Sequence, residues 1–442
     1  MVFSYSVLYY IVGCLCVTSK VSADCSYVDG NYYCSQAEAI DYEGIGFSGS
    51  YSDVTNMDET SCECSQSSVS FSGTMSPLDE ELSVHFRGPL KLAQFGVYYP
   101  ASSTSAKVKR DAEGCASYEH VHHKHKRAAA VQIVEETTTV YADASGNIIN
   151  PSTSAVAVAS GVAAVASAVV SAAASSAASS VASSAASSSS SSSSAVAGDW
   201  VRSSYYTPGT GDNVTFLNHQ GGVTDSGTWS TCFGNSLSYC ASDGVSGSSS
   251  SEVLSDVTIK SDVEYLIMSG SECGDSSASG DCGYYRTDTP AYHGFSGADK
   301  IFVFEFEMPS DTGSGDEQDM PAIWLLNAKI PRTLQYGEAT CSCWTTGCGE
   351  LDLFEILSAG SDKLISHLHD AQGSTDGTVY GGSGSQDYFA RPTDSTMKAA
   401  AVFTDGNVYI VELDDSTDFS STLTSDTVSS WTSTDATVVQ IS

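Results

Sequence analysis

Three carboxylates lie within one short run of this chain, at Glu350, Asp352 and Glu355. They alternate with apolar residues, which is the pattern of a β-strand that buries one face. Acidic residues are depleted in strands, and like charges on one face repel each other. Such a strand is therefore either solvent-facing surface or an arrangement built for carboxylate chemistry. Two carboxylates on one surface are the minimum for glycoside hydrolysis.

The spacing imposes a structural condition on that chemistry. In a regular strand Glu350 and Asp352 share a face, whereas Glu355 points to the other one. One extra residue, a β-bulge near Leu353 or Phe354, would return Glu355 to the face of the other two. A retaining glycosidase holds its two carboxyl groups about 5–5.5 Å apart, so the two glutamates must lean together. The charge of Asp352 between them would raise the pKa of the acid.

Two tryptophans flank this strand. Trp324 lies in the apolar run 320–326, and Trp344 lies shortly before Glu350. Sugar rings present apolar C–H faces, so indoles beside carboxylates favour a glycan-binding site. A lone tryptophan is more commonly a core residue, but two beside an acidic strand shift the balance toward substrate binding.

Two histidines follow the strand at alternating positions. His367 and His369 share a face of the segment 365–370, where they are placed to hydrogen-bond a sugar or a catalytic carboxylate. Zinc binding by this pair is the competing interpretation, but no third ligand stands at a telling spacing. Structural histidines with satisfied hydrogen bonds are the plain alternative. We expect no metal at the site and no cofactor, while a structural calcium stays an open alternative.

These residues carry a resemblance to known enzymes. The run 350–355 is similar to the bulged Glu-x-Asp-x-x-Glu signature of laminarinase-type enzymes of glycoside hydrolase family 16, and the segments 301–309, 321–326 and 404–411 resemble strands of that family. The whole chain resembles the yeast target of SBF cell-wall proteins, which join a Cys-containing N-terminal domain, a Ser/Ala linker and a C-terminal glycosyl hydrolase domain. That group is regarded as carrying a circularly permuted family 16 domain.

The resemblance implies an all-β fold, a β-jelly-roll sandwich, that acts on β-1,3-glucan. By it Glu350 would be the nucleophile, Glu355 the general acid/base and Asp352 the assisting carboxylate. Three cysteines just before the motif depart from the ordinary family pattern. A glucan transglycosylase and a non-catalytic glucan-binding structural wall protein are the alternatives to a retaining, endo-acting glucanase.

Composition divides the 442 residues into four parts. Residues 1–23 are expected to be a secretory signal peptide, and 24–105 a small Cys-containing β domain. Residues 106–198 combine a basic processing segment with a Ser/Ala-rich linker whose composition predicts disorder. Residues 199–442 show short alternating strands between turn residues, which predicts the glycosyl hydrolase-like β-jelly-roll domain.

The charge and the apolar segments narrow the partners. A formal net charge of −35 repels nucleic acid, and the Ala- and Ser-rich stretch at 155–175 is a poor membrane span. We therefore expect no nucleic-acid partner and no membrane span. The resemblance implies a secreted protein of the cell wall with β-glucan as its partner. Lys-Arg at 126–127 resembles a kexin processing site, which predicts cleavage after Arg127.

Cysteine numbers constrain the two predicted domains. Cys14 and Cys16 leave with the signal peptide, and the even remainder favours disulfides in a secreted chain. Both halves have an odd count: Cys25, Cys34, Cys62, Cys64 and Cys115 before the linker, and Cys232, Cys240, Cys273, Cys282, Cys341, Cys343 and Cys348 after it. Either at least one bridge joins the halves, or each half keeps a free thiol. Zinc binding by the last three cysteines is the weaker reading.

Overall fold

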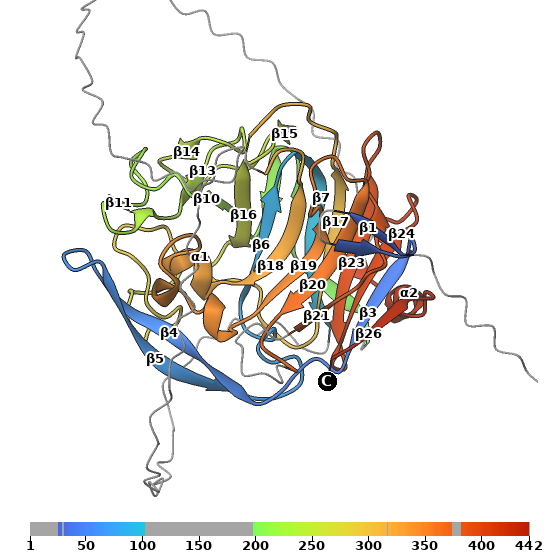
Figure 1. Ribbon diagram of the computed structural model, residues 1–442, viewed down its shortest axis with the longest axis horizontal. Helices are drawn as coiled ribbons and strands as arrows, with labels where there is room; N and C mark the ends of the chain where they lie inside the picture. Colours follow the sequence, from blue (N-terminus) through green and yellow to red (C-terminus); the bar gives the residue numbers. More distant parts are fainter. Residues whose placement is uncertain (1–24, 29–30, 102–197, 316, 374–381, 442) are drawn as a thin grey trace, which may run out of the picture. The chain divides into compact units, whose positions relative to one another are not determined.

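The computed structural model describes residues 25–28, 31–101, 198–315, 317–373 and 382–441. The predicted signal peptide and nearly all of the predicted linker, with Arg127, lie outside these residues. Within them the fold is built from two large packed sheets (Figure 1). The all-β sandwich expected from the sequence is confirmed.

The first large sheet is called the front sheet. Its strands are β6 (Leu82–Arg87), β10 (Val214–Asn218), β13 (Ser238–Cys240), β14 (Gly247–Ser248), β16 (Glu264–Ser269), β18 (Ala322–Asn327), β19 (Glu350–Glu355), β20 (Lys363–His369), β21 (Gly382–Gly384) and β22 (Phe389–Ala390). They follow the order β14-β13-β10-β16-β6-β18-β19-β20-β21, and β22 pairs with β20. The acidic run is therefore an interior strand, β19, between β18 and β20.

The second large sheet is called the back sheet. Its strands are β3 (Ala39–Glu43), β7 (Leu90–Pro100), β8 (Trp200–Thr207), β9 (Thr210–Asp212), β15 (Thr258–Ile259), β17 (Lys300–Glu307), β23 (Met397–Thr404), β24 (Asn407–Leu413), β25 (Thr422–Leu423) and β26 (Thr437–Gln440). The order is β25-β8-β7-β17-β23-β24-β3-β26, with β15 beside β7 and β9 beside β8. All neighbours are antiparallel except β26, which runs parallel to β3.

Smaller elements surround the sheets. They are the strand pairs β1 (Ser26–Val28) with β2 (Asn31–Tyr33), β4 (Gly49–Asp58) with β5 (Glu63–Phe71), and β11 (Trp229–Ser230) with β12 (Gly234–Asn235), the helices α1 (Lys329–Thr333) and α2 (Ser425–Thr432), and the 3-10 turns η1 (Ala339–Cys341) and η2 (Trp344–Thr346). None of the helices in the described ranges is long and apolar enough to cross a membrane.

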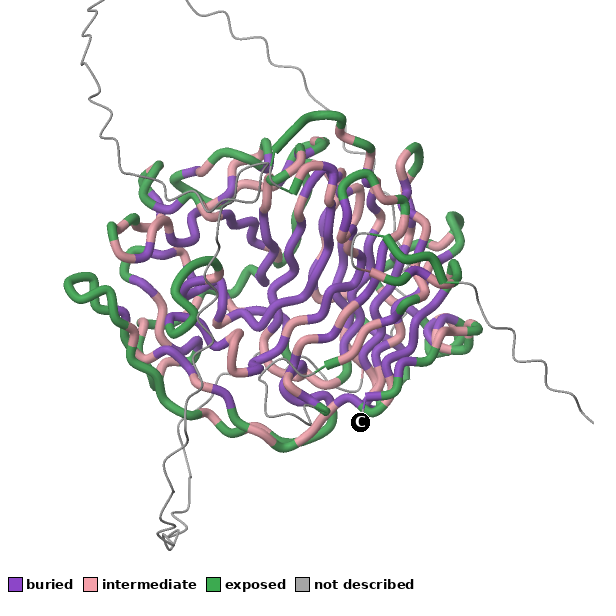
Figure 2. Tube along the Cα trace, viewed as in Figure 1, coloured by how far each residue is buried: buried purple, intermediate pink, exposed green. Residues whose placement is uncertain are grey.

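The main core lies between the two sheets. Val84 and Phe86 of β6 are fully buried there, and they pack in one cluster with Phe302 and Phe304 of β17. The central strands of both sheets are accordingly buried along most of their length (Figure 2). Because side chains alternate along a strand, the front sheet turns its other set of residues outward, away from this core.

The structure corrects the predicted division into an N-terminal and a C-terminal domain. Residues on both sides of the segment 109–192 form one compact unit. Strand β6 lies between β16 and β18, and β7 lies between β8 and β17. Residues 24–105 therefore do not make a separate small domain. Their strands β3, β6 and β7 pair with strands from residues 199–442 instead of with one another.

Disulfides join the same two parts of the chain. Cys62 bonds Cys232, and Cys64 bonds Cys341, so the predicted bridge between the halves exists. The other bridges that the structure shows are Cys25–Cys34, Cys273–Cys282 and Cys343–Cys348. Cys341, Cys343 and Cys348 therefore all form disulfides and do not make a zinc site. Among the described cysteines Cys240 is free, and burial raises the pKa of its thiol to about 12.

Candidate active site

The bulge that the acidic strand requires is present in β19. Against β18, Ile323 pairs with Phe354 but Trp324 pairs with Asp352, so Leu353 is the extra residue. The pairing with β20 shows the same insertion between Asp352 and Glu355. Leu353 and Phe354 are both fully buried on the core side. The outward face of the front sheet therefore receives all three carboxylates, as the sequence predicted.

Hydrogen bonds beneath the strand hold this bulge. The Ser366 hydroxyl donates to the carbonyl oxygen of Asp352 over 2.6 Å, which satisfies a backbone group that the irregular ladder leaves over. Tyr42, from strand β3 of the N-terminal segment, donates its hydroxyl to Ser366 Oγ over 3.0 Å. Both residues are fully buried. The geometry of the acidic strand thus depends on a residue that precedes the linker.

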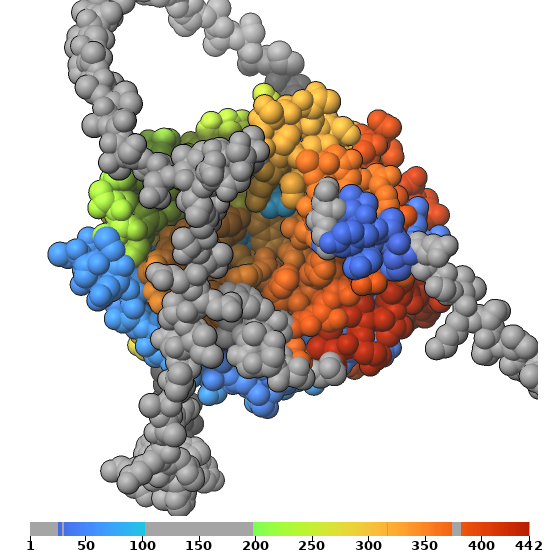
Figure 3. All heavy atoms as spheres, in the orientation of Figure 1, coloured from blue at the N-terminus to red at the C-terminus, as the bar shows by residue number. Residues whose placement is uncertain are grey.

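Neighbouring strands place the predicted site residues around the carboxylates. Glu350 pairs with His369, and Asp352 pairs with Trp324 on one side and His367 on the other. We call the residues Glu350, Asp352, Glu355, Trp324, Trp344, His367 and His369 the carboxylate face. Figure 3 shows a hollow in this view, with orange atoms of the motif region beside blue atoms of the N-terminal segment.

Two side chains of this face contact the carboxylates directly. The indole Nε1 of Trp344 donates a hydrogen bond to Glu350 Oε2, and His369 Nε2 lies 3.2 Å from Asp352 Oδ2. The Trp344 ring stands on η2, directly after Cys343, whose disulfide to Cys348 closes the short loop before β19. The cysteines that depart from the family pattern therefore fix the loop that orients Trp344.

The other predicted binding residues lie deeper. Trp324 is only 5% exposed, and the ring of His85 stacks on it with centroids 5.0 Å apart. It forms a floor rather than an open platform. His367 lies against Gly384 of β21, where a Cβ atom would come 1.9 Å from His367 Cδ2. Burial lowers the pKa of His367 to about 4, so this ring is neutral near pH 7.

Burial sets the electrostatics of the face. It raises the pKa of Glu350, of Asp352 and of Glu355 above their ordinary values. The charge of Asp352 raises the pKa of both glutamates further, while the Trp344 hydrogen bond lowers that of Glu350. Three adjacent carboxylates in a dry site cannot all ionise at neutral pH. The cluster therefore keeps a proton, and the indole donor favours Glu350 as an ionised member.

Arg87 of β6 was not anticipated from the sequence. Its Nη2 lies 3.5 Å from Glu355 Oε1, its Nη1 lies 2.9 Å from Glu317 Oε2, and its Nε donates to the Met320 carbonyl over 2.8 Å. The positive charge of Arg87 lowers the pKa of Glu355, and the negative charge of Glu317 raises it. Among the described residues, Arg87 is thus the one arginine or lysine that forms an ion pair with any of the three carboxylates.

A buried polar chain continues from the same strand. Ser83 Oγ lies 2.9 Å from His85 Nε2, and His85 Nδ1 lies 2.9 Å from Glu264 Oε1. Ser83 and His85 are fully buried, so this triad-like arrangement has no access for a substrate. The alternation of Ser83, His85 and Arg87 in the segment 82–87 was the only sequence signal for any of these residues.

Two clusters of described residues bring three metal-ligand types together. One oxygen each of Asp352 and Glu355 and one ring nitrogen of His367 lie within 4.8 Å of one another. The second cluster is Cys273, Cys282 and His293, but its two sulfurs already form a disulfide. Thiolates bind zinc and disulfides do not, so only the first cluster offers a donor set, and it coincides with the carboxylates themselves.

Comparisons with known proteins cover nearly the whole chain. Residues 198–431 match the family model described as "Cell wall protein YJL171C/Tos1, C-terminal", and residues 38–100 match the corresponding N-terminal model. No solved structure matches the chain at a significant level.

Curated relatives have similar lengths. A Candida albicans protein named "Probable circularly permuted 1,3-beta-glucanase TOS1" is 56% identical over 95% of this chain and 96% of its own. The Saccharomyces cerevisiae protein of the same name is 56% identical over 94% of each chain. A more distant relative from Arthroderma benhamiae, named "Probable circularly permuted 1,3-beta-glucanase", is 33% identical over 90% of this chain and 89% of its own.

Proposed function

Because the chain belongs to the Tos1 family of cell wall proteins, we propose that it is a secreted, endo-acting, retaining β-1,3-glucanase that remodels the fungal wall. The observation that carries the proposal is the bulge at Leu353, which turns Glu355 onto the face of Glu350 and Asp352. Two carboxyl groups on one surface, with pKa values raised by burial, are the equipment of a glycosidase. The names of the relatives supply the β-1,3-glucan as substrate.

The contacts assign a role to each carboxylate. Glu350, ionised and held by the Trp344 N–H, attacks the anomeric carbon, while Glu355 gives its proton to the departing glycosidic oxygen. A covalent glycosyl-enzyme results, and Glu355, now ionised, takes a proton from the water that releases it. Asp352, whose Oδ2 lies 3.2 Å from His369 Nε2, assists both steps. Its negative charge raises the pKa of Glu355 and so helps to keep the acid protonated.

The stereochemistry of the product tests this mechanism. The full chain is incubated with linear β-1,3-glucan oligosaccharides while proton NMR follows the anomeric signals. We expect the β-anomer to appear first and the α-anomer only by later mutarotation. An initial α-anomer would contradict retention, and products longer than the substrate would identify a transglycosylase. Binding of the glucan without any product would establish the structural alternative.

The two charged partners of Glu355 predict opposite changes in pH dependence. Glu355 must be protonated to act as acid, so activity falls as the pH rises through its pKa. Arg87→Met removes the charge that lowers this pKa and is expected to move the alkaline limb of kcat/KM upward by about one pH unit. Glu317→Gln removes the charge that raises it and should move the limb downward.

A matched control for that pair is Lys91→Met. Lys91 forms an ion pair with Asp256 over 2.8 Å on the back sheet, so its loss changes the net charge without touching the carboxylates. Its alkaline limb should coincide with that of the unaltered protein. Shifts of Arg87→Met and Glu317→Gln in the same direction would contradict the assignment of Glu355 as acid.

We also propose that a kexin-like protease cleaves after Arg127. The supporting observation is that the chain leaves the fold at Pro100 and re-enters it at Trp200, and these two residues are paired neighbours in the back sheet. A cut between them interrupts none of the strands that the structure describes. N-terminal sequencing of the mature protein should find a start after Arg127 besides Asp24, and Asp24 alone would refute the cleavage.

A further inference from the structure

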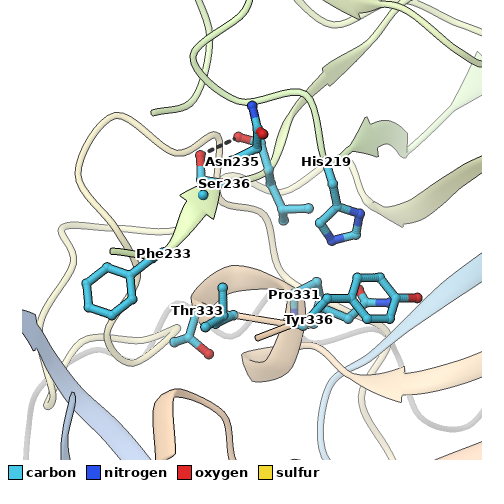
Figure 4. A pocket seen from close by; sticks show the side chains of 11 residues that line it. His219, Phe233, Asn235, Ser236, Pro331, Thr333 and Tyr336 are labelled. Atoms are coloured by element: carbon cyan, nitrogen blue, oxygen red, sulfur yellow. Dashed lines mark hydrogen bonds between the residues drawn. The ribbon is translucent and has the colours of Figure 1, made fainter. Parts of the chain in front are cut away.

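A cavity of about 190 Å³ lies beside the front sheet, away from the carboxylates. Two stretches of chain enclose it: the loop after β10, with His219 and residues 233–237, and the end of α1 with its continuation, residues 331–336 (Figure 4). The loop carries Cys232, whose disulfide to Cys62 ties it to the hairpin of β4 and β5. The volume is below the roughly 300–1,000 Å³ of sites for drug-sized ligands, so the cavity has room for one small ring.

The lining of this cavity combines apolar surface with unused polar atoms. Phe233, Pro331 and Tyr336 contribute rings, and the Tyr336 side chain is 61% exposed at the entrance. His219 Nε2 and Gln335 Oε1 are both shielded from solvent, and neither makes a hydrogen bond of normal geometry. The Gln335 side chain nevertheless lies close enough to His219 to raise the pKa of its ring slightly against the larger effect of burial. A buried polar group without a partner destabilises the protein, and a ligand that supplies the partner relieves this cost. Burial lowers the pKa of His219, so its ring is neutral and can accept or donate to a hydroxyl group.

Hydrogen bonds connect the cavity to the carboxylate face. Tyr336 donates its hydroxyl to Glu264 Oε2 over 2.6 Å, and Gln335 Nε2 donates to Glu264 Oε1 over 2.9 Å. Glu264 pairs with Arg87 across the sheet, and Arg87 in turn contacts Glu355. Three strand spacings separate β19 from β16, which is about 14 Å at ~4.8 Å each. The cavity therefore lies several sugar rings away from the candidate acid.

We propose that this cavity binds a single terminal glucopyranose ring of the glucan that the carboxylate face holds. The proposal rests on the proposed function and extends it to a second contact with the same polysaccharide. A pyranose matches the lining because its C–H faces suit the aromatic rings, while its hydroxyls satisfy His219 Nε2 and Gln335 Oε1. The small volume admits one ring with no continuing chain, and such a ring is either the end of a linear glucan or a one-ring branch.

Calorimetric binding separates these sources without requiring turnover. The full-length Glu350→Gln protein is titrated with linear β-1,3-oligosaccharides of increasing length and with short ones that carry one β-1,6-linked glucose. The affinity should increase sharply once the oligosaccharide is long enough, or carries the branch, to place a ring in the cavity. His219→Ala and Gln335→Met are each added to Glu350→Gln. Each should raise the Kd of the longer or branched oligosaccharide by about tenfold, which corresponds to the loss of one hydrogen bond.

The outcomes are distinct. A step with linear chains alone identifies a chain end, and a step with the branched compounds alone identifies a branch. Short unbranched oligosaccharides, which do not reach the cavity, serve as the reference, and their Kd should not change in either variant. Thermal unfolding of each variant reports any general damage to the fold. Glucan binding that neither substitution weakens would overturn the cavity proposal and leave the glucanase intact. No binding of any oligosaccharide to any variant would overturn both.

Discussion

Glu350→Gln is expected to lower kcat on β-1,3-glucan by at least about 10⁴-fold, because removal of a nucleophile eliminates the covalent route. The amide keeps the shape of the side chain and can still meet the Trp344 N–H, which donates to Glu350 Oε2 in the structure. The matched control is Glu38→Gln, a charge loss at an exposed position before β3. Its kcat should equal that of the unaltered protein, and retention of full activity by Glu350→Gln would exclude the mechanism.

The same substitution should not weaken the fold. Burial raises the pKa of Glu350, so ionisation of this carboxyl, which the mechanism requires, costs the folded protein more free energy than it costs the unfolded chain. The free energy of unfolding therefore falls as the pH rises above about 4.5, the ordinary glutamate value. Glutamine does not ionise, so Glu350→Gln removes this pH-dependent loss of stability. The melting temperature of Glu350→Gln should match or exceed that of the unaltered protein at pH 7, and the difference should vanish near pH 4.

Rescue by azide provides a second test of Glu350 as the nucleophile. In Glu350→Ala, azide enters the space of the lost carboxylate, forms a C–N bond to the anomeric carbon and displaces the glycosidic oxygen, which takes the proton of Glu355. An α-glycosyl azide should accumulate with a substrate that has a good leaving group. A merely structural glutamate would yield no such product.

Production of residues 199–442 alone is expected to give no cooperatively folded protein and no glucanase activity. The fragment lacks β6 from the middle of the front sheet, and β3 and β7 from the back sheet. It also loses Tyr42, which supports the bulge through Ser366. Thermal unfolding followed by circular dichroism should show no sharp transition, and a folded, active fragment would contradict the single-unit fold.

Co-production of residues 24–101 with residues 198–442 supplies the matched comparison. The two pieces should assemble, run as one band without reductant, and recover the melting temperature and the activity of the intact chain. The bridges Cys62–Cys232 and Cys64–Cys341 hold them together covalently. Cys62→Ser with Cys64→Ser should leave the pieces separable on a denaturing gel, although strand pairing still joins them in native buffer.

The candidate site could be predicted where its logic was local. The alternation at 350–355 and the five-residue offset of Glu355 required a bulge, and β19 has it at Leu353. The flanking Trp344 and His369 also follow from spacing, because strand pairing brings His369 opposite Glu350. Trp324 lies on the expected face, but neighbours from other segments cover it, and sequence spacing does not reveal such cover.

The long-range part of the fold could not be predicted in the same way. The segment 82–87 alternates like any half-buried strand, and its sequence does not indicate that β16 and β18 are its neighbours in the sheet. The low-complexity linker made a domain boundary the natural reading. The odd cysteine count in each half was the one signal against it, and two bridges do cross the boundary. They leave one cysteine over in each half: Cys240 is free, and Cys115 lies outside the described residues. Arg87 and Glu264 depend on the same pairing and were missed with it.

The parallel pairing of β26 with β3 has a consequence for biogenesis. The last strand at Thr437–Gln440 closes on one of the first, Ala39–Glu43, and one bridge spans 277 residues. A nascent chain must therefore keep β6 unpaired until β16 at Glu264–Ser269 has been synthesised, and β3 until β24 at Asn407–Leu413 has been. Folds with such high contact order form slowly and expose sticky edges on the way. The supply of chaperones and disulfide isomerases during synthesis should therefore limit the yield of folded protein more than the stability of the native state does.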